Sequence, residues 1–197
     1  MNTVYDFLIS PLEDSRYNNV KKVGNKELII NTEIFNHQYV NREAIVIATP
    51  LALKTPIKVG DTLLVHHNIF RRFHDIRGAE KNSRAWYKEN QYFAQLDQIY
   101  LYKRNNEWNC LEGFCFVKPI VNTDKFNTEK EENFKGIVKY TDGTVEKNQI
   151  VGFHPDSKFE FVVDGERLYR VKSNFITIKY EYQGDEEEYN PSWAQSS

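Results

Sequence analysis

The sequence predicts an all-β protein, and three observations carry that prediction. Short segments rich in valine, isoleucine, phenylalanine and tyrosine recur along the whole chain, and such residues suit a pleated, half-buried surface. Aromatic residues make up 14% of the 197 residues, whereas a single methionine is present. No stretch repeats its apolar residues with the 3.6-residue period of a long amphipathic helix. We therefore expect strands throughout and little helix.

Individual strands are predicted where a short apolar run lies between turn signals. Turn signals of glycine, asparagine and aspartate stand at 23–25, 59–61, 141–143 and 163–165. Many short strands separated in this way are typical of a barrel or a sandwich. The predicted strands are Asp6–Leu12, Lys26–Asn31, Glu43–Thr49, Thr62–His67, Tyr92–Leu96, Ile99–Lys103, Glu107–Leu111, Phe114–Val121, Lys135–Tyr140, Gln149–Phe153, Phe159–Val163, Arg167–Lys172 and Ile176–Tyr182.

The segments of the first half return in the same order in the second half, which indicates an internal duplication. An apolar strand that runs into a proline comes first, followed by a second apolar strand, a turn that leads through a strand to a histidine, and a closing pair of segments. In the first copy these are 7–12, 44–49, 59–66 and 92–102, and in the second copy they are 116–120, 136–141, 148–154 and 168–178.

This duplication predicts two domains, 1–104 and 105–183, of which the second is shortened in two loops. A tail at 184–197 follows, with the acidic run Gly184–Glu188 at its start. Charged runs at a terminus are commonly disordered, and we expect disorder here. Alternatively, Tyr189 and Trp193 anchor the tail to a neighbouring surface.

The order of elements resembles the co-chaperonins of the GroES type. In that family a strand enters an Arg-Pro-Leu-like turn, a long loop carries an aliphatic triplet, and a Gly-x-Val strand, a Val-Gly-Asp turn and a closing pair of strands follow. Here Ile9–Leu12 matches the opening, Arg42–Val46 the strand after the loop, Val59–Asp61 the turn and Phe93–Ile99 the closing step.

The resemblance covers 7–103 and, more weakly, 116–180, and it implies two tandem GroES-like small β-barrels. Three features depart from the family pattern. Ser10 stands where arginine is usual, Ala44 stands where glycine is usual, and the chain is a tandem. Two barrels in one chain do not fit a simple seven-membered ring.

The resemblance also implies a non-enzymatic protein that binds a chaperonin or assembles into a ring to assist protein folding. Leu28, Ile29 and Ile30 stand where the family's loop carries its aliphatic triplet. In such proteins the loop docks in an apolar groove of the chaperonin. Burial of each aliphatic side chain contributes about 1.5–3 kcal/mol, which offsets the cost of ordering the loop. Alternatively, Lys26–Asn31 is a strand paired within the barrel.

The corresponding segment of the second copy, 122–133, is polar and acidic, and Phe126 is its only apolar residue. We therefore expect a chaperonin contact from the first copy alone.

The stretch from His66 to Lys88 combines three histidines with basic and aromatic residues. Basic and aromatic side chains together suggest single-stranded nucleic acid, bound by stacking and phosphate contact, and this is the alternative function. A metal site is disfavoured because neighbouring strand residues face opposite ways and no carboxylate or cysteine completes a ligand set. The interpretation that we favour is an enlarged hairpin.

No catalytic motif is present: the sequence lacks Gly-x-Ser-x-Gly, a P-loop and His-Glu-x-x-His. It also lacks the dinucleotide-binding loop of the medium-chain alcohol dehydrogenases, whose first domain is the same barrel. We therefore expect no enzyme, no catalytic residues, no cofactor and no metal. A third hypothesis is a structural or assembly protein that kept the barrel without binding a chaperonin.

The remaining features concern location and partners. Cys110 and Cys115 form no CxxC motif, and we expect two free thiols in a reducing compartment. No signal peptide is recognisable, and no apolar run approaches the roughly 20 residues that span a bilayer. The net charge of −2 singles out no partner. We expect a cytoplasmic homo-oligomer without membrane contact, and we consider nucleic acid the less favoured partner.

Overall fold

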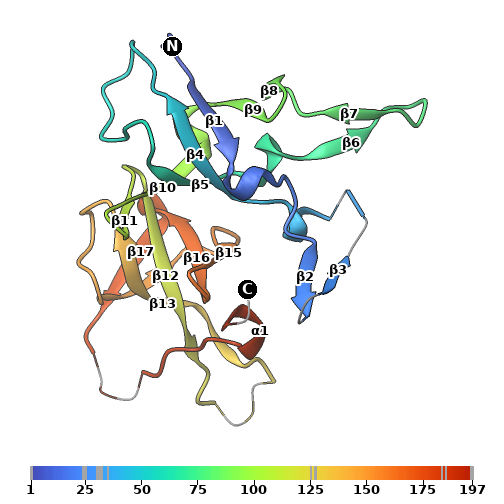
Figure 1. The fold of residues 1–197 in the computed structure, drawn as a ribbon. Coiled ribbons are helices and arrows are strands. Elements are labelled where there is room, and N and C mark those ends of the chain that lie inside the picture. The colour runs from blue at the N-terminus through green and yellow to red at the C-terminus, as the bar shows by residue number, and fades with distance from the viewer. Residues whose placement is uncertain are drawn as a thin grey trace. The chain divides into compact units, whose positions relative to one another are not determined.

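A computed structural model describes residues 2–23, 26–29, 33–34, 36–124, 126, 128–182, 184 and 186–195. The chain divides into two compact units, Met1–Trp108 and Asn109–Ser197 (Figure 1). The division falls four residues after the boundary drawn from the repeat. Strands dominate both units, whereas helix is confined to short 3-10 turns and to α1, Ser192–Gln195. The predicted all-β class is confirmed.

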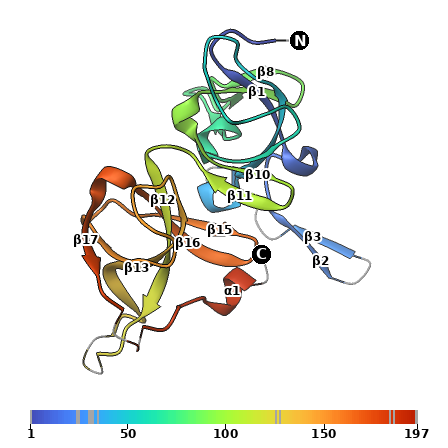
Figure 2. The same ribbon diagram turned by 90° about the vertical axis from the view of Figure 1, so that its left-hand side faces the viewer.

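The first unit is built around a seven-stranded sheet with the order β11-β10-β5-β4-β1-β9-β8, whose outer strand β11 runs across the boundary at Trp108 (Figures 1 and 2). Two small sheets, β2-β3 and β6-β7, lie outside it in the pairing order. The strands are β1 (Phe7–Pro11), β2 (Val20–Val23), β3 (Lys26–Ile29), β4 (Glu43–Ala48), β5 (Thr62–Val65), β6 (Arg72–His74), β7 (Glu80–Asn82), β8 (Trp86–Lys88), β9 (Gln91–Ala94), β10 (Ile99–Arg104) and β11 (Glu107–Cys110).

The second unit is a six-stranded sheet with the order β15-β16-β12-β13-β14-β17. Its strands are β12 (Phe114–Val121), β13 (Glu131–Thr141), β14 (Ile150–Phe153), β15 (Phe159–Val163), β16 (Glu166–Lys172) and β17 (Ile176–Tyr180).

The two sheets share one strand order. Read from the opposite end, the second sheet runs β17-β14-β13-β12-β16-β15, which matches β10-β5-β4-β1-β9-β8 strand for strand. The registers agree as well, because Pro11 lies opposite Ala44 in one sheet and Pro119 lies opposite Gly136 in the other. The β1–β4 pair and the β12–β13 pair each carry a bulge two residues before the proline. The duplication therefore extends to the irregularities of the sheet.

The structural register corrects one detail of the repeat. The sequence segments 92–102 and 168–178 set Tyr92 beside Leu168. In the sheets, Tyr92 lies opposite Ile9, and Tyr169 lies opposite the equivalent Val117. The closing segments therefore correspond with a shift of one residue. Three connections, not two, are shorter in the second unit, since 142–149 also replaces the longer 49–61.

Both sheets are open in their pairing order among the described residues. The outer strands are β11 and β8 in the first sheet and β15 and β17 in the second. Each sheet nevertheless buries an apolar core. The fully buried side chains of the first unit include Phe7, Leu8, Ile9, Leu63, Val65, Ile69, Phe70, Tyr92, Ile99 and Leu101. One buried cluster of the second unit consists of Cys115, Val117, Val138, Val145, Val151, Phe153, Tyr169 and Val171.

The C-terminal segment packs on the second unit, so the expected disorder is wrong for residues 186–195. The amide of Tyr189 donates to the carbonyl of Pro119 at 2.9 Å, and Lys118 forms an ion pair with Glu188 at 2.7 Å. Ala194 of α1 is fully buried. The alternative, an anchored tail, describes these residues.

Candidate functional site

The two ends of the long connection between β1 and β4 are held together by Tyr17, Val40 and Asn41, which form a clamped base. Tyr17 and Val40 form an antiparallel bridge across it. Asn41 is 4% exposed, and its side-chain amide donates to the carbonyls of Leu12 at 3.1 Å and Ser15 at 2.8 Å. These bonds hold the two limbs together at the point where they leave the sheet.

Beyond this base the connection forms the hairpin β2–β3, which carries the predicted chaperonin-binding residues. Leu28 is 54% exposed and Ile29 is 66% exposed, while Ile30 lies outside the described residues. Ile29 pairs with Val20 across the two strands, and Val20 is also exposed. Because successive residues of a strand face opposite sides, Leu28 presents its side chain on the other face.

The hairpin is not part of the main sheet. Within the described chain, β3 pairs only with β2, in a separate two-stranded sheet. The alternative of a strand paired within the barrel is therefore wrong for Lys26–Ile29. An isolated hairpin gains little stability from pairing alone, and its aliphatic side chains are left facing solvent.

Tyr17 joins the β1–β4 connection to the start of β6. Its hydroxyl donates to the carbonyl of Ile34 at 3.0 Å, and it accepts from the amide of Arg72 at 2.9 Å. The guanidinium of Arg72 also lies over the Tyr17 ring, 5.0 Å from its centre. The segment that leads from the hairpin back to β4 and the start of β6 are thus both bonded to one buried side chain.

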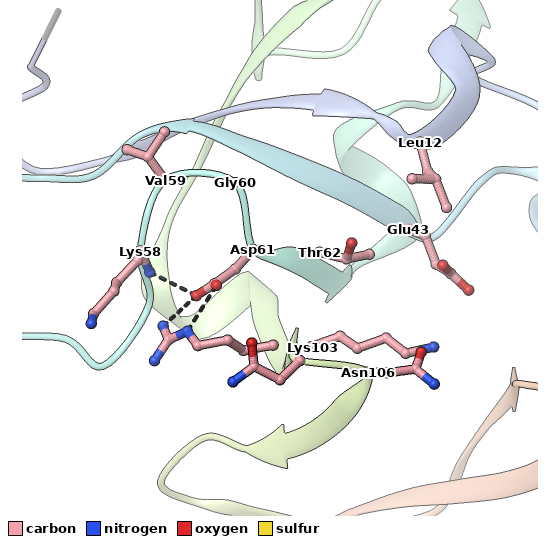
Figure 3. Close-up of a pocket in the computed structure, with 11 residues that line it drawn as sticks. Leu12, Glu43, Lys58, Val59, Gly60, Asp61, Thr62, Lys103 and Asn106 are labelled. Carbon is pink, nitrogen blue, oxygen red and sulfur yellow. Dashed lines mark hydrogen bonds and ion pairs between the residues drawn. The ribbon is translucent and has the colours of Figure 1, made fainter.

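The predicted Val59–Asp61 turn borders an open groove of about 650 Å³ (Figure 3). Asp61 is almost fully buried there, and its carboxylate accepts from Arg104 at 2.6 Å and from the amide of Lys58 at 2.8 Å. Burial alone would raise the pKa of Asp61, but the hydrogen bonds from Arg104 and Lys58 hold it below its usual range. The bond between Asp61 and Arg104 therefore holds the turn against the end of β10.

Three histidines meet near the clamped base. The rings of His66 and His67 stack with centres 4.4 Å apart, and His37 approaches His67 at 5.3 Å. Burial, followed by the neighbouring charges of His66 and Arg42, lowers the pKa of His67 to about 3. His67 is therefore a neutral aromatic side chain at ordinary pH. Among the residues that the structure describes, no histidine, cysteine or carboxylate cluster has the geometry of a metal site.

The predicted enlarged hairpin corresponds to β6 and β7, with β8 following. Ion pairs join Arg72 to Glu80 at 2.8 Å and Lys81 to Asp75 at 3.8 Å. Ile76, at its tip, is fully exposed. The aromatic side chains Phe73, Trp86 and Tyr87 are each between 41% and 42% exposed.

The second unit holds a buried polar network that the sequence did not predict. Glu131 accepts from Arg167 at 2.6 Å and from Lys158 at 3.2 Å, and it also bonds with the Tyr169 hydroxyl. Burial would raise the pKa of Glu131, but Tyr169, Arg167 and Lys158 hold it below its usual range. Burial and the bond to Glu131 raise the pKa of Tyr169. No local sequence pattern predicts a contact such as that between Glu131 and Arg167, because the two residues are far apart in the sequence.

Both cysteines are free thiols. Cys115 is fully buried, with its sulfur 3.4 Å from the Ser173 hydroxyl, which in turn donates to Asp142 at 2.6 Å. Burial raises the pKa of Cys110, and a raised pKa leaves little reactive thiolate. The two thiols therefore have the surroundings of structural cysteines.

No protein-family model matches the sequence, and no curated protein is significantly similar to it. No helix in the described part of the chain has the length and apolar character needed to cross a membrane.

Proposed function

We propose that this protein is a non-enzymatic, co-chaperonin-like protein that binds a chaperonin through the β2–β3 hairpin. The observation that carries the proposal is the exposure of Leu28 and Ile29, at 54% and 66%, on a hairpin separate from both main sheets. Ile30, which continues the aliphatic triplet, belongs to the same proposed contact.

The surroundings of the hairpin support this proposal. Its base is held by Asn41 and by the bridge between Tyr17 and Val40, so the aliphatic side chains extend from a fixed origin. Burial of an exposed leucine or isoleucine in an apolar groove contributes about 1.5–3 kcal/mol. Two or three such side chains supply enough affinity to order a short hairpin and to retain a partner.

We further propose that each unit is a GroES-like module. The shared strand order of the two sheets supports a duplicated ancestral module, and the Val59–Asp61 turn lies between β4 and β5. The expected assembly into a homo-oligomer, the cytoplasmic location and the absence of a cofactor belong to the same proposal.

The test is binding of the full chain to a purified chaperonin ring of the class that GroES-type proteins bind, with and without nucleotide. Sedimentation should show the chain moving with the ring. The double substitution Leu28→Ser/Ile29→Ser should abolish co-sedimentation, because it removes the apolar side chains that enter the groove.

The matched control replaces two other exposed aliphatic residues of the first unit, Leu51 and Val4, which are 70% and 58% exposed. Leu51→Ser/Val4→Ser should bind as the wild type does. If the wild-type chain never moves with the ring, the protein is not a co-chaperonin, and an assembly role without chaperonin binding takes its place.

A second candidate function is binding of single-stranded nucleic acid at β6–β8. The exposed Phe73, Trp86 and Tyr87 on a stretch rich in arginine and lysine favour it, since bases stack on aromatic rings while cations contact phosphates. Ion pairs to Glu80 and Asp75 offset part of that charge. Titration with a single-stranded oligonucleotide at low salt should quench tryptophan fluorescence, and Trp86→Phe should remove the quenching; no quenching at low salt excludes this function.

A further inference from the structure

The two units differ at one equivalent edge of their sheets. In the first unit, β10 continues through the turn Asn105–Asn106 into β11, which pairs along its outer side. In the second unit, the equivalent strand β17 is the outermost strand, and no described strand lies beyond it (Figures 1 and 2). An uncovered edge strand offers a row of backbone donors and acceptors for another strand.

The side chains of β10 and β17 also differ in their exposure. Leu101 of β10 is fully buried, whereas Ile178, at the equivalent position of β17, is 49% exposed. Thr177 and Lys179 on either side of Ile178 are exposed as well. Tyr182, just beyond the end of the strand, is 70% exposed. The edge of the second unit thus presents both backbone and apolar side chains to solvent.

The backbone of β17 faces outward at defined residues. The carbonyl of Tyr180 accepts from the Gln149 side chain at 2.8 Å, and Gln149 directly precedes β14, so Tyr180 turns its backbone groups towards the inner neighbour. Since these groups alternate along a strand, Lys179 turns its groups outward, and an added strand that lengthens β17 by one residue would set those of Glu181 outward as well. These two residues are therefore the ones that would exchange hydrogen bonds with an added strand.

The sequence around Tyr180 is complementary to itself in antiparallel pairing. With Tyr180 opposite Tyr180 of a second copy, Lys179 lies opposite the partner's Glu181, and Ile178 lies opposite the partner's Tyr182. Opposite charges and aromatic–β-branched pairs both favour a cross-strand contact. A register shifted by two residues, and so centred on Lys179, would instead set Lys179 opposite Lys179.

We infer that β17 is a homodimerisation edge, on which a second copy of this chain adds its own β17 in antiparallel register centred on Tyr180. The contact is isologous, because each copy gives and receives the same residues. It joins the two six-stranded sheets into one. This inference is independent of chaperonin binding.

Analytical ultracentrifugation of the full chain tests the inference, over concentrations from about 1 to 500 µM, because a single pair of edge strands makes a small and weak interface. The wild type should pass from 23.3 kDa towards twice that mass. Lys179→Glu and Glu181→Lys should each raise the dissociation constant by about tenfold or more, since each places like charges opposite one another at two symmetric sites.

The double substitution Lys179→Glu/Glu181→Lys should return the dissociation constant to near the wild-type value, because it restores both pairs with reversed sign. Lys54→Glu makes the same charge change at an exposed lysine of the first unit and should leave dimerisation unchanged. A wild type that stays monomeric, single variants without effect, a double variant that fails to recover, a control that weakens equally, or a species larger than a dimer would each overturn the inference.

Discussion

The first and second units have the same sheet and different attachments. Both share the order of six strands, the proline opposite a small residue and the bulge that precedes it. The first unit adds the hairpins β2–β3 and β6–β7. The residues described in the second unit form neither hairpin and instead carry the Glu131 network and a packed C-terminal segment. The comparison indicates that the sheet is the shared scaffold and that the connections carry the structural differences between the units, as is usual for loops on a rigid frame.

Removal of the Glu131 carboxylate should have the largest effect, and only on the second unit. Glu131→Gln leaves Arg167 and Lys158 half-buried without their shared anion, and we expect a loss of about 2–3 kcal/mol. Hydrogen exchange measured by mass spectrometry on peptides from each unit should show faster exchange in the second unit alone. Glu112→Gln, an exposed glutamate of the same unit, should change nothing.

The same substitution gives a test of pH dependence. The pKa of Glu131 is lower in the folded chain than its ordinary value of 4.5. Its carboxylate therefore stabilises the second unit at pH values above 4.5, and that stabilisation is lost as the pH falls below 4.5 through the folded pKa. Acid unfolding of the second unit should be steeper in the wild type than in Glu131→Gln; equal profiles would contradict the assignment.

The equivalent positions Ala44 and Gly136 should respond unequally to an exchange of residues. A Cβ atom on Gly136 would lie 2.8 Å from the backbone carbonyl of Lys118, and we expect Gly136→Ala to cost about 2 kcal/mol. Ala44→Gly creates no clash and should cost about 1 kcal/mol through backbone entropy and a lost methyl contact. Urea unfolding, followed by exchange in each unit, measures both. A Gly136→Ala variant as stable as the wild type would show that the second sheet gives way at this point.

Asn41 and Asn133 also occupy equivalent positions, three residues before Ala44 and Gly136. Asn41 is buried and bonded to two carbonyls, so Asn41→Ala should cost about 1–2 kcal/mol and speed exchange throughout the β2–β3 hairpin. Asn133 is exposed, and Asn133→Ala should stay within about 0.5 kcal/mol of the wild type. Equal effects of the two substitutions on stability would mean that Asn41 does not hold together the two ends of the β1–β4 connection.

Strands and duplication could be predicted from the sequence because the strands appear as short apolar runs between turn signals and the duplication appears as the same order of short motifs in each half. The register could not, since Tyr92 and Leu168 fit the pattern as well as Tyr92 and Tyr169. The separate pairing of Lys26–Ile29 was also hidden, because a β-rich segment has the same composition in a main sheet and in a lone hairpin. The position of Leu28 and Ile29 came from the family resemblance, and their exposure came only from the structure. The network of Glu131 and Arg167 depends on contacts between distant residues, which leave no local signal.

The smallest expected effect concerns the tail of the second unit, for which the first unit has no counterpart. The guanidinium of Arg167 lies over the Trp193 ring, 6.0 Å from its centre, and Asn190 accepts from the Arg167 amide at 3.1 Å. Trp193 is about half exposed, so Trp193→Ala should cost only about 0.5–1 kcal/mol. Faster exchange should be confined to residues 186–195 and to residues 165–167 at the start of β16, whereas Phe126→Ala, a truncation of a fully exposed aromatic ring, should leave both unchanged. If exchange instead rose across the whole second sheet, the tail would be part of its core, and the two units would differ in how they fold as well as in what they carry.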